Sequence, residues 1–354
     1  MRLSSLVRGT DRIPGSIVST MDHIFDLVIV GAGPSGLAAA VAAGKAGLRY
    51  TVLEKGVLVN SIFNFPRNMV FFTTPELLEI GGLPFTTPFE KPTRWEALRY
   101  YRRVADTYRI PVLFDEEVLG IRPGEQGVDG ARRFEIVTSL RDGSRGSHES
   151  RFVLLASGYY DHPNLIGVPG EELPHVHHYY TEPHGYYRKN VVVVGGKNSA
   201  AIAALELYRG GSTVTLVHRR DRLSDSIKYW IRPDIDNRIK EGSIQALFES
   251  SVVRIQPDSV VIDSGGRLQE VRADAVFLMT GYHPDSSLMS RAGVRMSGET
   301  MAPEYNPDTF ETNVRGLFVA GSIVSGRDTN RTFIENGRFH GEAVVGAILA
   351  RLRE

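Results

Sequence analysis

The feature that most constrains this chain is a strand–glycine turn–helix pattern that occurs twice. The first copy is "LVIVGAGPSGLAAA" at 27–40, and the second is "VVVVGGKNSAAIAALE" at 191–206. We call them the first and second elbows. Such an elbow presents the N-terminus of a helix to the pyrophosphate of a dinucleotide. Two of them predict an α/β fold with two Rossmann-like dinucleotide-binding domains.

The first elbow matches the full G-x-G-x-x-G pattern. Gly31 permits the tight turn after the strand, Gly33 leaves room for the pyrophosphate, and Gly36 lets the helix pack closely on the strand. An acidic residue is expected about 20 positions further on, where it meets the ribose hydroxyls. Glu54, at the end of "YTVLE", has that place. The complete set favours a dinucleotide site over a structural glycine turn.

The second elbow keeps the order but changes the chemistry. Its three motif positions are filled by Gly195, Lys197 and Ala200. In place of the acid stands a basic trio: His218, Arg219 and Arg220. A carboxylate there would repel a 2′-phosphate, whereas arginines can bind it bidentately. The trio therefore favours an NADP site over a merely solvated strand end. For Lys197 two interpretations stay open, a contact with a phosphate and a side chain that points to solvent.

Opposite ribose chemistry at the two elbows predicts two different dinucleotides, FAD at the first and NADPH at the second. No third elbow follows residue 281, so the last segment is expected to return to the first unit. We therefore expect a discontinuous FAD-binding domain at 24–160 and 282–354. An NADPH-binding domain at 161–281 is inserted in it, and residues 1–23 are expected to be a disordered tail.

Composition excludes several other classes of protein. Lysine plus arginine equals aspartate plus glutamate, at 41 each, so no strong field favours nucleic acid or a membrane surface. The chain has no cysteine, which excludes thiolate metal sites and any protein thiol couple. Residues 27–44 are uncharged, but the glycines and Pro34 within them fit an elbow better than a membrane span. We expect a cytoplasmic protein without a membrane or nucleic-acid partner.

Longer motifs resemble those of thioredoxin-reductase-like flavoproteins with two dinucleotides. These motifs are "GAGPSG", "LLASGYY", "FLMTGYHPD" and "TNVRGLFVAGS". Within that group the chain resembles the bacillithiol disulfide reductase family across nearly all of 24–350. The pieces that carry this closer resemblance include "EKGVLVNSIFNFP", "ASGYYDHPNLIGVPGE", "GGKNSA" and "FIENGRFHG". The resemblance implies hydride transfer from NADPH to FAD and then electron delivery to an acceptor.

The resemblance also implies which residues contact each cofactor. For FAD they are Gly31, Gly33, Pro34, Ser35, Gly36, Glu54, Lys55, Ala156, Gly158, Gly321 and Ser322. For NADPH they are Gly195, Gly196, Lys197, Asn198, Ser199, Ala200, His218, Arg219 and Arg220. No metal site and no catalytic acid or base is assigned.

Two positions depart from the family pattern. Members commonly carry a cysteine where this chain has Ser35, and many flavoprotein reductases have an aspartate where this chain has Ser322. The first departure bears on the acceptor, which stays open between a small disulfide reduced without a protein thiol and a redox protein such as ferredoxin. Two further functions stay open as well: a flavin monooxygenase, because "LASGY" is similar to a motif of those enzymes, and a non-catalytic NADPH sensor. A homo-oligomer is also left open.

Other motifs have competing interpretations. "HVHHYY" (175–180) fits a strand or loop surface better than a metal site. The aromatic residues of 179–190 are expected to pack a hinge between domains, or else to stack on a cofactor. Trp230 is expected to anchor its loop by burial, and Trp95 to lie on the apolar face of a helix at 94–109. In "FIENGRFHG", by resemblance, the helix N-terminus faces the flavin, although Glu335 and His340 could instead only cap and pack that helix.

Overall fold

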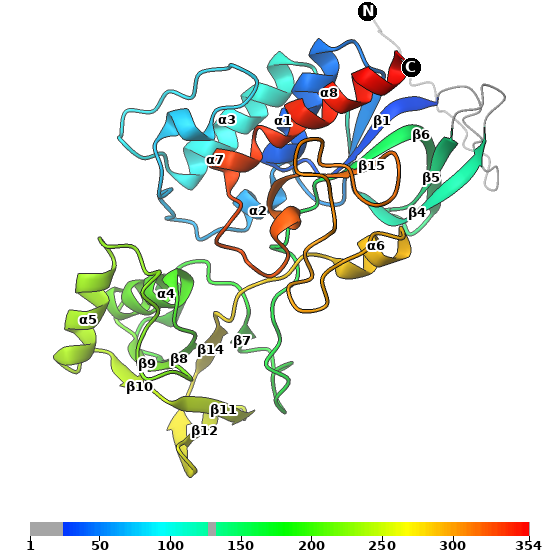
Figure 1. The fold of residues 1–354 in the computed structure, drawn as a ribbon. Helices are drawn as coiled ribbons and strands as arrows, with labels where there is room; N and C mark the ends of the chain where they lie inside the picture. Colours follow the sequence, from blue (N-terminus) through cyan, green and yellow to red (C-terminus); the bar gives the residue numbers. More distant parts are fainter. Residues whose placement is uncertain (1–23, 127–131, 354) are drawn as a thin grey trace, which may run out of the picture.

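The computed structural model describes residues 24–126 and 132–353, so the predicted N-terminal tail lies outside the described residues. Figure 1 shows two units joined by narrow connections. The first contains a seven-stranded sheet in the order β3-β2-β1-β6-β5-β4, with β15 paired to β6. These strands are β1 (Phe25–Val30), β2 (Tyr50–Glu54), β3 (Val112–Phe114), β4 (Glu116–Gln126), β5 (Arg132–Leu140), β6 (Arg145–Leu155) and β15 (Leu317–Val319).

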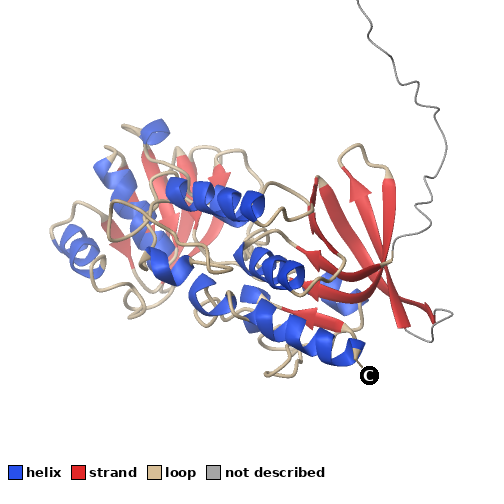
Figure 2. Cartoon of the chain, turned by 90° about the horizontal axis from the view of Figure 1, so that it is seen from above, coloured by secondary structure: helices blue, strands red, loops and turns tan. Residues whose placement is uncertain are grey.

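Helices rich in small residues cover one face of the first sheet. The helices and 3₁₀ helices of this unit are α1 (Pro34–Lys45), α2 (Asn60–Phe63), η1 (Pro75–Leu78), α3 (Arg94–Thr107), α6 (Ser286–Arg291), η3 (Gly321–Ser325), α7 (Ile334–Gly337) and α8 (His340–Leu352). Helices α1 and α8 lie side by side in Figures 1 and 2. A Cβ on Gly341 would lie 2.5 Å from Ala39 Cα, so only glycine allows this close helix contact. The last helix of the chain thus completes the unit that the first strand begins.

The second unit contains an all-parallel sheet in the order β10-β9-β8-β14-β7. Its strands are β7 (Val176–His177), β8 (Asn190–Val194), β9 (Thr213–Val217), β10 (Gln245–Leu247) and β14 (Ala275–Leu278). The other elements of this unit are η2 (His184–Tyr186), α4 (Asn198–Arg209), α5 (Arg232–Lys240), and the antiparallel strands β11 (Ser250–Ile255), β12 (Ser259–Ser264) and β13 (Arg267–Arg272). The first sheet is mixed, with β4, β5 and β6 antiparallel and the other pairs parallel, and the second sheet is parallel. These sheets with their covering helices confirm the predicted α/β class.

The chain crosses between the units twice, at 156–164 (the first crossing) and at 279–285 (the second crossing), and these two segments pair with each other. Asn164 N donates to Gly281 O at 2.9 Å, and His283 N donates to His162 O at 2.9 Å. An antiparallel bridge joins Pro163 and Tyr282 between these bonds. Residues far apart in sequence thus form one short two-stranded connection, visible between the units in Figure 1.

Asp115 separates β3 from β4, because its φ of 57° turns the chain between them. The buried face of α3 is formed by Ala97, Tyr100, Tyr101 and Val104. Trp95 does not belong to it and is 59% exposed, so that expectation was wrong. No helix among the described residues is long and apolar enough to cross a membrane.

Candidate functional site

The glycines of the first elbow have two distinct roles. Gly31 has a φ of 104°, and a Cβ there would lie 2.6 Å from Ala156 O. A Cβ on Gly36 would lie 2.0 Å from Gly31 O. These two glycines permit close backbone packing. By contrast, a Cβ on Gly33 would meet no atom of the described chain within 4 Å. Gly33 therefore borders open space at the start of α1, as a pyrophosphate cradle requires.

Glu54 is tied to this elbow. Its side chain is 6% exposed, and its two oxygens accept hydrogen bonds of 2.8 Å from Ala32 N and Gly56 N. Burial raises the pKa of Glu54, while the two N–H donors act in the opposite direction. Each oxygen has a second lone pair that can accept a ribose hydroxyl. Next to it, Lys55 pairs with Asp161 of the first crossing at 3.0 Å.

Three segments converge beside Ser35, at the beginning of α1. A Cβ on Gly321 would lie 2.6 Å from Ser35 Oγ, and a Cβ on Gly337 would lie 3.0 Å from it. A Cβ on Gly158 would lie 3.6 Å from Ser322 Oγ. The resemblance implied that three segments contact FAD: the first elbow, the first crossing and the late "FVAGS" segment. These three segments are therefore neighbours in space.

His340 contacts the late "FVAGS" segment through a hydrogen bond to Gly321. Its ring stacks on Phe310 at a centroid distance of 4.1 Å, and its Nδ1 accepts a hydrogen bond of 3.1 Å from Gly321 N. Burial lowers the pKa of His340 to about 4, so the ring is neutral near pH 7. A neutral ring that accepts at Nδ1 carries its proton on Nε2. The histidine at the start of α8 was visible in the sequence, but its partner 19 residues earlier was not.

The second elbow copies the first in its backbone. Gly195 has a φ of 152°, and a Cβ there would lie 2.6 Å from Met279 O. A Cβ on Gly196 would lie within 2.2–2.5 Å of three atoms of the His218 ring, so this imidazole lies against Gly196. His218 Nε2 is buried and has no hydrogen-bond partner among the described residues. Burial lowers the pKa of His218, and the nearby charges of Arg220 and Arg219 lower it further.

The other predicted NADPH residues separate into anchored and free side chains. Asn198 holds the loop after β9, because its Oδ1 accepts from Lys228 N at 2.9 Å and its Nδ2 donates to Ser226 O at 3.2 Å. Lys197 and Ser199 are exposed at the start of α4, and Ala200 is buried beneath it. Arg219 and Arg220 are exposed, and within the described part of the chain neither guanidinium forms an ion pair. The free basic pair is thus available to an anionic ligand.

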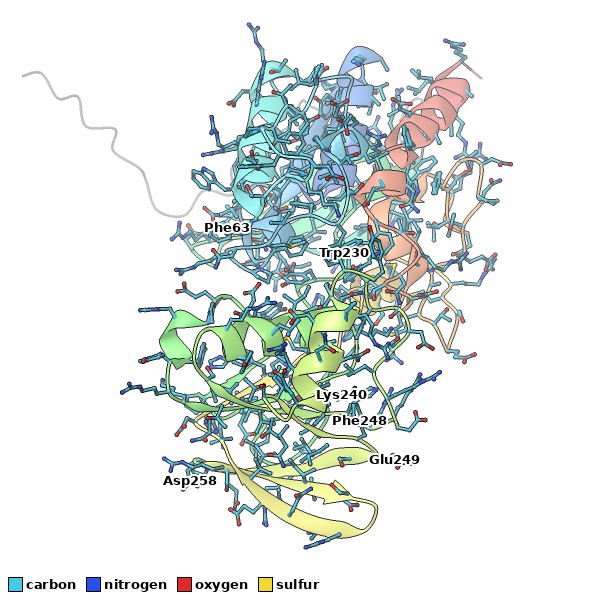
Figure 3. All side chains as sticks on the ribbon, turned by 90° about the vertical axis from the view of Figure 1, so that its left-hand side faces the viewer. Phe63, Trp230, Lys240, Phe248, Glu249 and Asp258 are labelled. Carbon is cyan, nitrogen blue, oxygen red and sulfur yellow. The ribbon has the colours of Figure 1, made fainter. Side chains whose placement is uncertain are left out.

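Trp230 contacts the first unit. The expectation of burial was wrong, since 40% of Trp230 is exposed. Its ring instead meets Phe72 edge-on at 5.7 Å, and Lys91 Nζ lies 4.0 Å above it. Figure 3 labels Trp230 at the boundary between the two units. A second contact joins the units where Arg67 pairs with Glu182 at 3.1 Å.

Tyrosines pack around the paired crossings. Tyr160 and Tyr282 lie 4.5 Å apart between ring centroids, and Tyr179 stacks on Tyr282 at 5.5 Å. Burial raises the pKa of Tyr160 well above its usual range and that of Tyr179 to about 12, so both hydroxyls stay protonated at neutral pH. Of the aromatic residues at 179–190, Tyr179 thus packs at the crossings between the units, as the hinge prediction expects. Within residues 24–126 and 132–353, no group of histidine and acidic side chains is arranged to hold a metal ion.

Comparison with known proteins agrees with this geometry. The pyridine nucleotide-disulphide oxidoreductase family model matches residues 28–321. The chain belongs to this family. It is 42% identical over 325 residues to bacilliredoxin reductase Bdr of Bacillus subtilis (strain 168), covering 92% of this chain and 97% of that protein. The structure of bacillithiol disulfide reductase Bdr from Bacillus cereus superposes with a TM-score of 0.90 and 41% identity, over 93% of this chain and all of that one.

Membership of this family makes the protein an NADPH-dependent flavoprotein oxidoreductase that uses FAD, and it confirms the resemblance to bacillithiol disulfide reductases. A ferredoxin–NADP reductase of Ignicoccus hospitalis is a more distant relative, 26% identical over 84% of this chain and 90% of that protein. A flavin monooxygenase from Stenotrophomonas maltophilia shares the fold, with a TM-score of 0.72 at 20% identity. The open space at Gly33 and the free basic pair fit the two cofactors that the family uses.

Proposed function

We propose that this protein uses NADPH to reduce a low-molecular-weight disulfide, without help from a protein thiol, in the cytoplasm. One NADPH, one proton and one disulfide give NADP⁺ and two thiols. The likeness over 93% of the chain to a protein named bacillithiol disulfide reductase supports the disulfide as acceptor. The absence of cysteine from the full sequence requires that electrons reach the substrate without a mixed disulfide to the enzyme.

In this proposal each elbow holds the dinucleotide that its ribose chemistry favours. When bound, FAD supplies the two-electron redox chemistry. The open side of Gly33 admits its pyrophosphate, Glu54 accepts its ribose hydroxyls, and His340 fixes the Gly321 turn beneath it. Arg219 and Arg220 bind the 2′-phosphate of NADPH. The other residues predicted to contact FAD lie in or near the first elbow, the first crossing and the late "FVAGS" segment. The other residues predicted to contact NADPH lie in or near the second elbow.

We also propose the domain division 24–160 with 282–354, and 161–281. The sheets support it, because β15 pairs with β6 of the first sheet although it follows the second sheet in the chain. The crossings at 156–164 and 279–285 are then linkers whose pairing constrains relative motion of the domains.

Anaerobic stopped-flow spectroscopy tests the function. FAD-loaded enzyme is reduced with NADPH and then mixed with bacillithiol disulfide, while flavin absorbance is followed. We expect rapid reduction and slower reoxidation, because no thiolate is present to attack sulfur. Reoxidation as fast as reduction would contradict the idea that the missing thiol limits electron exit. Failure of every small disulfide to reoxidise the enzyme would reject the proposed function.

A redox protein is the second candidate acceptor. The likeness to a ferredoxin–NADP reductase supports it, because the name of that relative gives ferredoxin, a protein, as its partner. The same reduced enzyme, mixed with a ferredoxin in place of the disulfide, distinguishes the two. Reoxidation by ferredoxin alone would make this the function.

A further inference from the structure

A hollow of about 470 Å³ lies where the two crossings meet the loop after η3. We call it the hinge hollow. Its lining comes from the first crossing, the second crossing and the loop after η3: His162, Pro163, Asn164, Leu165, His283 and Arg327. None of these residues belongs to either predicted dinucleotide site. The hollow is thus separate from the residues predicted to contact FAD and NADPH.

The charged and titratable side chains that line the hollow are all basic. His162 and His283 lie 5.8 Å apart between ring centroids, with their planes inclined by 27°. Arg327 is exposed, and in the described part of the chain its guanidinium has neither an ion pair nor a hydrogen bond. His283 Nδ1 donates to Pro284 O at 2.9 Å, so Nε2 of the neutral ring is an acceptor. The free guanidinium of Arg327 therefore gives the lining its preference for an anion.

The acidic residues next to these groups are already engaged. Asp161 pairs with Lys55 at 3.0 Å. Asp285 caps α6 by accepting from Ser287 N and Leu288 N at 2.9 and 3.2 Å. Asp328 does not line the hollow and accepts from Asn330 N. The positive lining is thus not neutralised by a carboxylate that lines the hollow.

The hollow is close to the proposed flavin contacts. His162 follows Gly158 by four residues, and four residues of extended chain span at most about 14 Å. Arg327 follows Ser322 by five residues, and Gly158 and Ser322 approach each other directly. The backbone around His162 and His283 is held by the hydrogen bond from His283 N to His162 O. A small molecule bound in the hollow would lie beside the segments assigned to FAD.

We propose that the hinge hollow binds the carboxylate groups of a small anionic disulfide and selects it over a neutral one. This inference rests on the proposed function and names its class of substrate. A guanidinium can bind a carboxylate through two parallel hydrogen bonds, and the ring N–H of His162 can add a further donor. The selection arises from the protein's own charge and needs no covalent contact.

A matched pair of disulfides provides the test. Dithiodiglycolate has two carboxylates, and bis(2-hydroxyethyl) disulfide is a neutral molecule of similar size. With FAD-loaded enzyme and saturating NADPH, we expect kcat/KM to be at least about tenfold higher for the dianion, as one charge-assisted hydrogen bond would give. Arg327→Gln and His162→Gln should each reduce this ratio severalfold. The control Arg267→Gln, an exposed arginine on β13, should keep it. A ratio near one in the wild type, or an unchanged ratio in both variants, would overturn the proposal.

Binding of adipate, a dicarboxylate without sulfur, separates this inference from the proposed function. Calorimetric titration of the FAD-loaded enzyme with adipate should show binding that weakens in Arg327→Gln and persists in Arg267→Gln. If this holds but neither disulfide is reduced, the hollow stands and the proposed function falls. If both disulfides are reduced equally and adipate does not bind, the hollow proposal falls and the function stands. Flavin content and melting temperature verify that each variant is folded.

Discussion

The two elbows share a backbone arrangement and differ in the side chains beside it. Gly31 and Gly195 each face a carbonyl oxygen, Ala156 O and Met279 O, that a Cβ would approach to 2.6 Å. Close strand-to-turn packing thus fixes the elbow shape in both units. The two elbows differ at the carboxyl end of their second strand. Glu54, the last residue of β2, is buried and bound to its elbow, while Arg219, shortly after β9, is exposed and forms no ion pair within the described part of the chain. A preorganised site suits a resident cofactor, and an open site suits one that exchanges.

The two units also differ in the hydrogen bonding of one buried histidine each, His340 in the first unit and His218 in the second. His340 has a defined acceptor role toward Gly321 N–H, and His218 has a buried nitrogen without a partner among the described residues. Burial lowers the pKa of both rings, but only His340 is committed to a backbone hydrogen bond. The histidine of the first unit is therefore satisfied at its acceptor nitrogen, whereas His218 retains a nitrogen that can still form a hydrogen bond.

The largest expected effect is loss of FAD from Gly33→Leu. The side chain would fill the open space that the pyrophosphate needs, so the variant should purify nearly colourless. Flavin content per chain, from the absorbance ratio, measures this. Gly346→Leu is the matched control, because a Cβ there also points into open space but Gly346 lies on the exposed face of α8. Full flavin occupancy in Gly33→Leu would show that the first elbow does not hold FAD.

The next effect concerns choice of nicotinamide cofactor. Each charge-assisted hydrogen bond contributes about 1.5–3 kcal/mol, so two arginines can provide roughly hundredfold discrimination for NADPH over NADH. Replacing both Arg219 and Arg220 with glutamine should raise KM for NADPH by that factor and leave NADH nearly unchanged. Steady-state kinetics with both cofactors measure it. Equal losses for the two would place the arginines in folding instead of recognition.

A smaller effect is a pH dependence that belongs to the first site. Because the folded-state pKa of His340 is lowered to about 4, the unfolded chain binds more protons below pH 6.5. Stability is thus fully present above that pH and is lost as pH falls toward 4. Between pH 7 and 5 the free energy of unfolding should fall by about 1 kcal/mol, since solvent screens part of the shift.

Denaturant unfolding of the wild type and His340→Asn at the two pH values isolates this contribution. The substitution removes the titrating group, so the variant should show a smaller loss of stability on acidification. An identical loss in both proteins would assign the pH dependence to other residues.

The smallest effect is expected at Ser35. Its hydroxyl packs near Gly321 and Gly337, so Ser35→Ala should weaken FAD binding slightly and change the rate of flavin reoxidation by a disulfide only a few-fold. Thiol-alkylating reagents should leave every activity unchanged, because the chain has no cysteine. Loss of reoxidation in Ser35→Ala would instead give the serine a direct part in electron exit.

Local patterns predicted both elbows because a glycine turn between a strand and a helix is encoded within about 15 residues. Contacts between distant residues could not be predicted this way. The pairing of His162 with His283, the bond from Gly321 to His340, and the contact of Trp230 with Phe72 all depend on how the units meet. Trp95 was misassigned because an apolar side chain at helical spacing does not reveal which side of α3 is covered.

The return of the chain to its first sheet has a consequence for biosynthesis. Among the described strands, none of the first sheet lies between those of the second sheet, which is complete once β14 has been made. The first sheet then still lacks β15, and α1 lacks its partner α8, which follows β15 in the chain. The face of α1 that packs on α8 thus stays uncovered until α8 has been made, although α1 is translated long before it. The second unit is free to fold first, and the first unit closes only after α8 has emerged from the ribosome.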